Sequence, residues 1–109
     1  MTIQWSVTLL DERVEGKLSA QPVDIRARFE RIVRLIQTVG LKRVREPYVK
    51  HLEGRLWEMR IKGKDGIARA IYVTVTGRRI VVLRVFTKKT EKTPRREIEL
   101  ALARAKEVS

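Results

Sequence analysis

Basic side chains stand inside and directly after the most apolar segments of this sequence. Arg69 and Arg84 each interrupt an apolar run, and five basic residues follow in "TKKTEKTPRRE", residues 87–97. A buried guanidinium without a partner is costly, so each arginine must reach water, a carboxylate or a phosphate. Two interpretations follow. Either Arg69 pairs with Glu58 across a sheet and Arg84 extends to the sheet edge, or both arginines bind a polyanion.

Binding of a polyanion would suit metal-free cleavage of RNA. Attack of a ribose 2′-hydroxyl on the neighbouring phosphate needs a base, positive charge on the developing phosphorane, and an acid for the leaving oxygen. Arginine forks bind phosphate oxygens bidentately, and a lysine crowded by other cations can act as the base. His51 is the only histidine and could serve as base or acid. The basic residues near expected strand ends are Lys50, His51, Arg60, Arg69, Arg84, Lys88 and Lys89.

The composition favours an anionic partner. The chain has 109 residues, with 25 Lys plus Arg against 13 Asp plus Glu, and its formal net charge is +12. A field of this sign attracts phosphates, and would also suit an acidic protein or an anionic membrane.

Several other classes of site have no support. Cysteine is absent and histidine occurs once, which argues against a disulfide, a thiol nucleophile or a multi-histidine metal site. We expect no metal and no cofactor. The sequence has neither a signal-peptide pattern nor an apolar stretch long enough to span a membrane, so we expect a cytoplasmic protein.

Apolar periodicity predicts the elements of the first half of the chain. Alternation indicates a strand at residues 3–9, and a short, weak helix is expected at 11–18. Apolar residues at intervals of three and four predict a stronger helix at 22–39, which carries a row of arginines on its opposite side. That row is either a solvated face or a binding surface. Residues 41–54 are predicted to form a loop.

The second half predicts an antiparallel meander followed by a helix. Strands are expected at 55–62, 67–75 and 80–86, joined by two short turns. Pro94 can open a helix running to about Glu107, with its apolar stripe at Ile98, Leu102 and Ala105. The simplest arrangement is an α+β fold with the helices on one face of the sheet, leaving Glu58 and Arg60 on a more open face.

An ordered set of motifs then adds a resemblance to a known family. The set consists of "LWEMR" at 56–60, Arg69, "FTKKT" at 86–90, "TP" at 93–94 and "EI" at 97–98. Over roughly residues 50–106 the chain resembles the phage-derived Gp49-like branch of HigB toxins, in the RelE/ParE superfamily of toxin–antitoxin modules.

The resemblance implies a RelE-like domain spanning residues 1–109. Its fold would be an antiparallel four-stranded sheet packed against two N-terminal helices and a C-terminal helix. It also implies a toxin that cleaves mRNA on the ribosome, contacts ribosomal RNA, and is held inactive by a helix-turn-helix (HigA-like) antitoxin. By matching position, the implied catalytic residues are Arg60, Arg69, Lys88 and Lys89. The RNA-binding candidates beside them are Lys50, His51, Arg84, Lys92 and Arg95.

Two departures from the family pattern keep alternatives open. Ala68 stands where the family often has an aromatic residue, and Arg84 stands where a histidine is frequent. The base-stacking platform and the acid–base assignment therefore stay open, and Trp57 is interpreted as a core residue. A ParE-like toxin that inhibits DNA gyrase without cutting RNA is one alternative function, and an inactive basic RNA-binding module is another. The Lys88–Lys89 pair favours the RNA branch.

Overall fold

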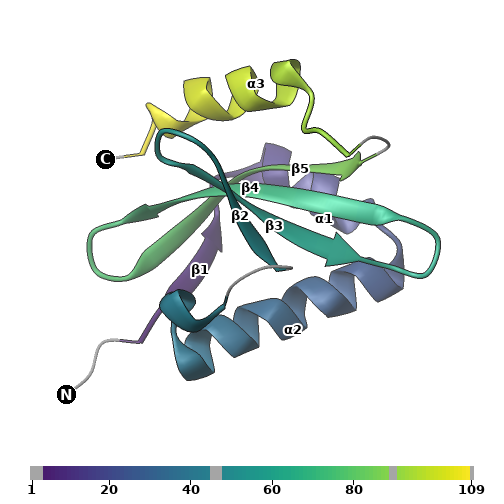
Figure 1. The fold of residues 1–109 in the computed structure, drawn as a ribbon, viewed down its shortest axis with the longest axis horizontal. Helices are drawn as coiled ribbons and strands as arrows, with labels where there is room; N and C mark the ends of the chain where they lie inside the picture. Colours follow the sequence, from purple (N-terminus) through teal and green to yellow (C-terminus); the bar gives the residue numbers. More distant parts are fainter. Residues whose placement is uncertain (1–3, 45–47, 89–90, 109) are drawn as a thin grey trace.

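The computed structural model describes residues 4–44, 48–88 and 91–108, with the backbone alone at Lys88. Its elements follow the order expected from the sequence, with one additional strand (Figure 1). In chain order they are β1 (Ser6–Leu9), α1 (Glu12–Ser19), α2 (Val23–Val39), the 3-10 turn η1 (Leu41–Arg43), β2 (Val49–Glu53), β3 (Leu56–Lys62), β4 (Ile67–Val75), β5 (Arg79–Lys88) and α3 (Arg95–Ala105).

The sheet has five strands in the order β1-β5-β4-β3-β2. Strands β2 to β5 pair antiparallel with their neighbours, which confirms the predicted meander, while β1 joins β5 in parallel. The loop prediction for residues 41–54 was wrong where β2 forms. The segment is too short and too polar to show a strand pattern, and it becomes a strand because β3 offers an edge for it to pair with.

Local signals explain where the first two helices begin and end. Asp11 caps α1, because its carboxylate accepts hydrogen bonds from the backbone N–H groups of Arg13 and Val14. The apolar stripe of α2 is buried as predicted. At its end Gly40 takes a φ of 86°, a left-handed conformation that glycine adopts most easily, and its N–H donates to the Ile36 carbonyl.

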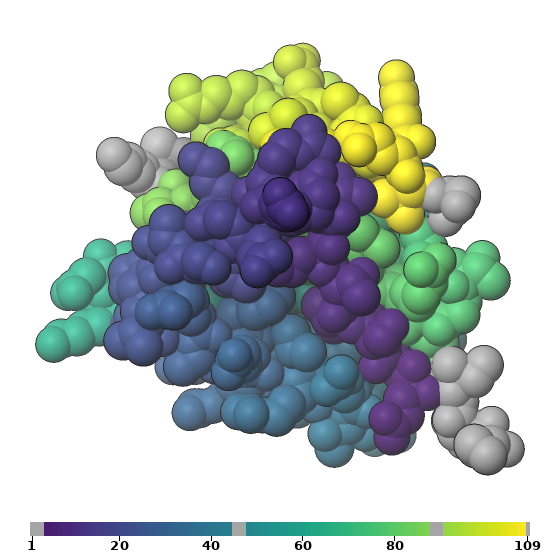
Figure 2. All heavy atoms as spheres, turned by 180° about the vertical axis from the view of Figure 1, so that it is seen from behind, coloured from purple at the N-terminus to yellow at the C-terminus, as the bar shows by residue number. Residues whose placement is uncertain are grey.

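Helices cover both faces of the sheet, which corrects the expectation of a single covered face. One core joins α2 and Val14 of α1 to Met59, Ile61 and Tyr72 of the sheet. The second core joins α3 to the opposite face. Figure 1 shows α2 and α3 on opposite sides of the strands, and Figure 2 shows the purple and blue N-terminal helices covering the rear.

The reason lies in the composition of the central strands. β4 and β5 read as nearly continuous apolar runs, and both faces of such strands must be buried. The stripe of α3 is also rotated from the predicted one. Its buried residues are Glu97, Ala101, Arg104 and Ala105, while Ile98 and Leu102 are partly buried. Among the described residues no helix has both the length and the apolarity needed to cross a bilayer.

Replacing Phe29 with alanine should destabilise the fold by about 3–5 kcal/mol, because the ring fills the core between α2 and the sheet. Leu35, on the same helix, is a matched control, since its side chain is 38% exposed. Thermal and denaturant unfolding of the two variants measure the difference. A Phe29→Ala protein that unfolds at the same midpoint as Leu35→Ala would contradict this packing.

Candidate functional site

A buried ion pair lies between the sheet and α3. Glu58 of β3 and Arg69 of β4 are 0% and 3% exposed, and Arg69 Nη1 donates a hydrogen bond to Glu58 Oε1. The other carboxylate oxygen accepts a hydrogen bond from the Thr93 hydroxyl at 2.6 Å. Thr93 is buried directly before α3. The pair therefore fixes the point at which the chain returns from β5 to start this helix.

Arg69 therefore pairs with Glu58 across the strands, which is the first of the two interpretations drawn from the sequence. Its guanidinium is not open to a phosphate in this arrangement, although its Nε has no hydrogen-bond partner among the described residues. Contact between Arg69 and RNA would require the bond to Glu58 to break. This position suits a residue that holds neighbouring groups in place.

Two further arginines connect the sheet to α3. Arg84 Nε donates to Glu97 Oε1 at 2.7 Å, and the two side chains are 18% and 8% exposed. Arg84 therefore does not extend to the sheet edge, because α3 covers it and supplies a carboxylate. Arg104 Nη1 donates to the Leu83 carbonyl at 2.7 Å, and burial lowers the pKa of Arg104. Sequence reasoning missed Arg104, because it does not belong to the apolar stripe predicted for this helix.

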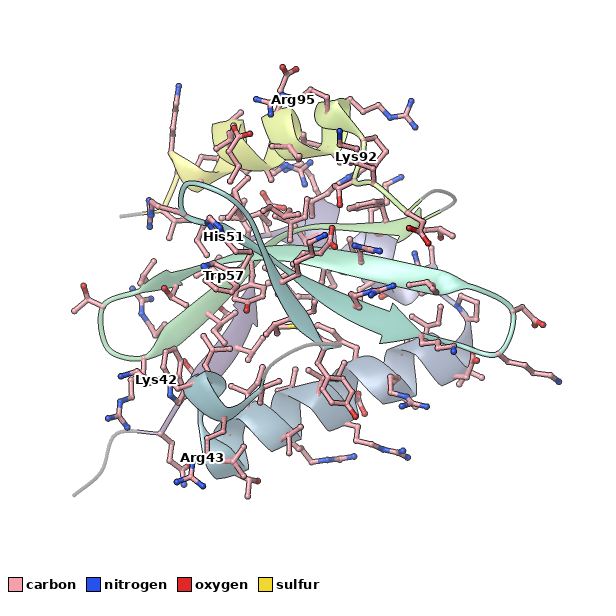
Figure 3. The ribbon with its side chains drawn as sticks, in the orientation of Figure 1. Lys42, Arg43, His51, Trp57, Lys92 and Arg95 are labelled. Carbon is pink, nitrogen blue, oxygen red and sulfur yellow. The ribbon has the colours of Figure 1, made fainter. Side chains whose placement is uncertain are left out.

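The exposed candidates lie around this layer. Directly opposite residues in a sheet share a face, so Lys50 shares the face of Glu58, while His51 shares the opposite face with Trp57. The His51 and Trp57 rings are 5.0 Å apart, and His51 Nε2 lies 2.8 Å from the Gly54 carbonyl oxygen. Trp57 is 39% exposed and so is not the core residue that the sequence suggested. Figure 3 shows the two rings beside each other on the β2–β3 hairpin.

The start of α3 carries exposed cations, labelled in Figure 3 as Lys92 and Arg95. Arg95 forks onto Glu53 of β2, with N–O distances of 2.5 and 3.1 Å, and this cation lowers the pKa of Glu53. Both side chains are solvent-accessible, so the pair is weak enough to be exchanged for a phosphate.

Arg60 is exposed, although it stands directly opposite the buried Arg69. Lys88 ends β5 opposite Ile67 of β4, which itself pairs with Lys62 of β3, so these three positions form a row across one end of the sheet. Lys89 lies outside the described residues. Within the described ranges no three His, Cys, Asp or Glu side chains gather as metal ligands would.

The family model "Phage derived protein Gp49-like (DUF891)" matches residues 16–106. The chain belongs to this Gp49-like family.

Two solved structures share the fold of this family member. The RelE–RelB complex from the archaeon Pyrococcus horikoshii OT3 matches with a TM-score of 0.61 at 21% identity, covering 79% of this chain and 97% of that one. A doubly substituted E. coli toxin RelE in the free state matches with a TM-score of 0.61 at 15% identity, covering 97% and 99%. No curated protein matches the sequence. The RelE-like α+β fold is therefore confirmed, with a fifth strand added to the expected sheet.

The buried pair generates a stability prediction. Arg69→Met should cost about 3–5 kcal/mol, because it leaves the Glu58 carboxylate buried without its cation. The double variant Glu58→Leu with Arg69→Met should recover most of that loss, since two packed apolar side chains can replace a buried ion pair. Denaturant unfolding of the single and double variants measures both changes.

The matched control for this comparison is Arg95→Ala, which breaks a solvent-exposed ion pair and should leave the unfolding midpoint nearly unchanged. A double variant no more stable than Arg69→Met would show that the two side chains do not form one energetic unit.

Proposed function

We propose that this chain is the toxin of a type II toxin–antitoxin module and that it cleaves mRNA on the ribosome in the cytoplasm. The observation that carries the proposal is membership of the Gp49-like family on a fold shared with RelE toxins. A net charge of +12 supports it, because an enzyme that docks on ribosomal RNA must bind many phosphates.

The reaction proposed is attack of a ribose 2′-hydroxyl on the adjacent phosphate, without a metal. Arg60 is an exposed arginine on the sheet face that carries Glu58, and we assign it to the phosphate oxygens. The candidates for the base are Lys88, at the end of β5, and Lys89, which follows it in the sequence. Arg69 acts through Glu58 and Thr93, and so positions the segment between β5 and α3 without touching RNA.

The remaining basic residues divide between two roles. Lys50, Lys92 and Arg95 border the site and are assigned to phosphate contacts. Arg84 holds α3 in place, because Glu97 already occupies its guanidinium. His51 shares a face with Trp57 and is assigned to RNA outside the cleavage site.

The antitoxin proposed is a small helix-turn-helix protein of the HigA type. One of the solved structures with this fold is a complex of RelE with RelB, which supports a protein partner for this chain as well. Co-expression with a neighbouring gene of that type should restore growth.

Inducible expression with mapping of mRNA 5′ ends tests the proposal. The wild-type protein should produce new 5′ ends inside coding regions. Arg60→Ala should lower the cleavage rate about 100- to 1000-fold, as for loss of one group that stabilises transition-state charge. Arg60→Lys should rescue poorly, because lysine lacks the bidentate fork.

The control for Arg60 is Arg79→Ala, which removes the same charge at the far end of the sheet, where Arg79 pairs with Val75. Growth arrest with every transcript intact would contradict mRNA cleavage. If gyrase supercoiling were then inhibited, the ParE-like alternative would take its place.

A further inference from the structure

A basic groove runs between α2 and the free edge of β3. Its volume is about 350 Å³, and its walls are Arg28, Tyr48, Arg60, Lys62 and Ile67. The groove lies where β2 pairs with β3 only as far as Met59, so that among the described residues no strand neighbours the last residues of β3 on that side. Tyr48 closes the gap, with its carbonyl accepting a hydrogen bond from the Arg60 N–H at 2.8 Å.

The cations of this groove form no ion pair within the part of the chain that the structure describes. Among the described residues, no ion pair or side-chain hydrogen bond joins Arg28, Arg60 or Lys62 to another group. None of the described residues that line the groove is acidic. This differs from the layer beneath α3, where Arg69 and Arg84 are each neutralised by a glutamate. Three unpaired cations around one hollow make a site for an anion.

The basic surface continues beyond the groove along α2. Arg28 also borders a hollow of about 510 Å³ with Lys62 and Lys64, and another of about 310 Å³ with Arg31 and Arg34. Asp24 also lines the first of these hollows, where its carboxylate accepts a hydrogen bond from the Lys64 backbone N–H at 2.5 Å. The cations thus follow a path rather than surround one point, which suits a chain of phosphates.

Tyr48 supplies a second kind of contact. Its side chain lines both the groove and the neighbouring hollow on α2, and the residue is 39% exposed. An aromatic ring beside a row of cations is the combination by which proteins bind single-stranded nucleic acid, since bases stack on the ring while the cations hold the backbone. An acidic peptide would satisfy the cations but would leave the ring without a stacking partner.

We propose that this groove is a second RNA-binding site, in which Tyr48 stacks on a base and Arg28 and Lys62 bind the flanking phosphates of a single strand. Arg60 joins the groove to the face that carries Glu58, so one RNA strand passes from the cleavage site around the free edge of β3 onto α2. The path of the RNA strand from the cleavage site to the groove rests on the proposed function. The binding of RNA in the groove rests on the groove alone.

The test uses the full-length protein and a labelled single-stranded 2′-O-methyl RNA of about ten nucleotides. Such RNA cannot be cut by attack of a 2′-hydroxyl, so fluorescence anisotropy reports binding independently of cleavage. Tyr48→Ala should weaken binding about 5- to 100-fold, as for loss of one stacked base. Tyr48→Phe keeps the ring and should bind within about twofold of the wild type.

The cations are tested through the salt dependence of the same binding. Arg28→Ala and Lys62→Ala should each reduce the slope of log K against log salt by about 0.7, the value for one phosphate of a single strand. The matched control is Arg79→Ala. Arg79 pairs with Val75, which is eight residues from Ile67 along β4 and therefore about 26 Å from the groove residue Ile67. This variant should leave both the slope and the effect of Tyr48 unchanged.

Several outcomes would overturn the inference. One is that the Tyr48→Ala, Arg28→Ala and Lys62→Ala proteins bind the RNA with the same affinity and salt dependence as Arg79→Ala. Another is that the wild type binds a polyglutamate peptide or an RNA hairpin more tightly than the single strand. Failure of the proposed function looks different: the wild type would then cut no mRNA while the Tyr48 and salt effects on RNA binding persisted. Cleavage that persists without any Tyr48 effect would refute the groove and leave the toxin assignment standing.

Discussion

The ion pair between Glu58 and Arg69 is the constraint around which the α3 side of the molecule is built. Both side chains lie under α3, and desolvating two charges is costly unless their hydrogen-bonding groups are satisfied. The hydroxyl of Thr93 donates a hydrogen bond to the second oxygen of the Glu58 carboxylate. Because that hydroxyl comes from the residue just before Pro94, the charge pair and the start of α3 cannot be moved independently.

The rest of this layer follows the same pattern. Arg84 meets Glu97, and Arg104 meets the Leu83 carbonyl, so three arginines are held where the second core joins the helix to the sheet. Small residues, Ala101 and Ala105, let the helix approach the strands closely. Exposed cations lie outside this layer, among them those at the start of α3, along the edge of β3 and on α2. The buried charges hold the scaffold together, whereas the exposed cations lie at the surface.

Sequence patterns could predict most of the framework. The three-and-four spacing of α2 and the two short turns of the meander depend on local residues, and both are confirmed. The pairing of Arg69 with Glu58 could also be predicted, since the neighbouring strands contain few other carboxylates. The strand β2 was not predictable in this way, because five residues of mixed polarity acquire a strand conformation only from the edge they join.

The site was harder to predict, because burial depends on neighbours that are distant in sequence. Arg60 and Arg69 are directly opposite each other, yet one is exposed and the other is buried. Arg69 belongs to the central strand β4, whereas Arg60 lies where β3 has already passed the end of β2. No local pattern distinguishes two such arginines. The groove around Tyr48 has the same origin, since α2 and the edge of β3 meet only in the folded chain.

We propose that the protein cuts mRNA by using the RNA's own 2′-hydroxyl as the nucleophile. Purified ribosomes carrying an mRNA with a single 2′-deoxy substitution at the mapped cleavage nucleotide test it most directly. Cleavage at that position should disappear, while binding of the protein to the ribosome and cleavage of the unmodified mRNA continue. Cleavage of the substituted mRNA at the rate of the unmodified one would contradict the mechanism.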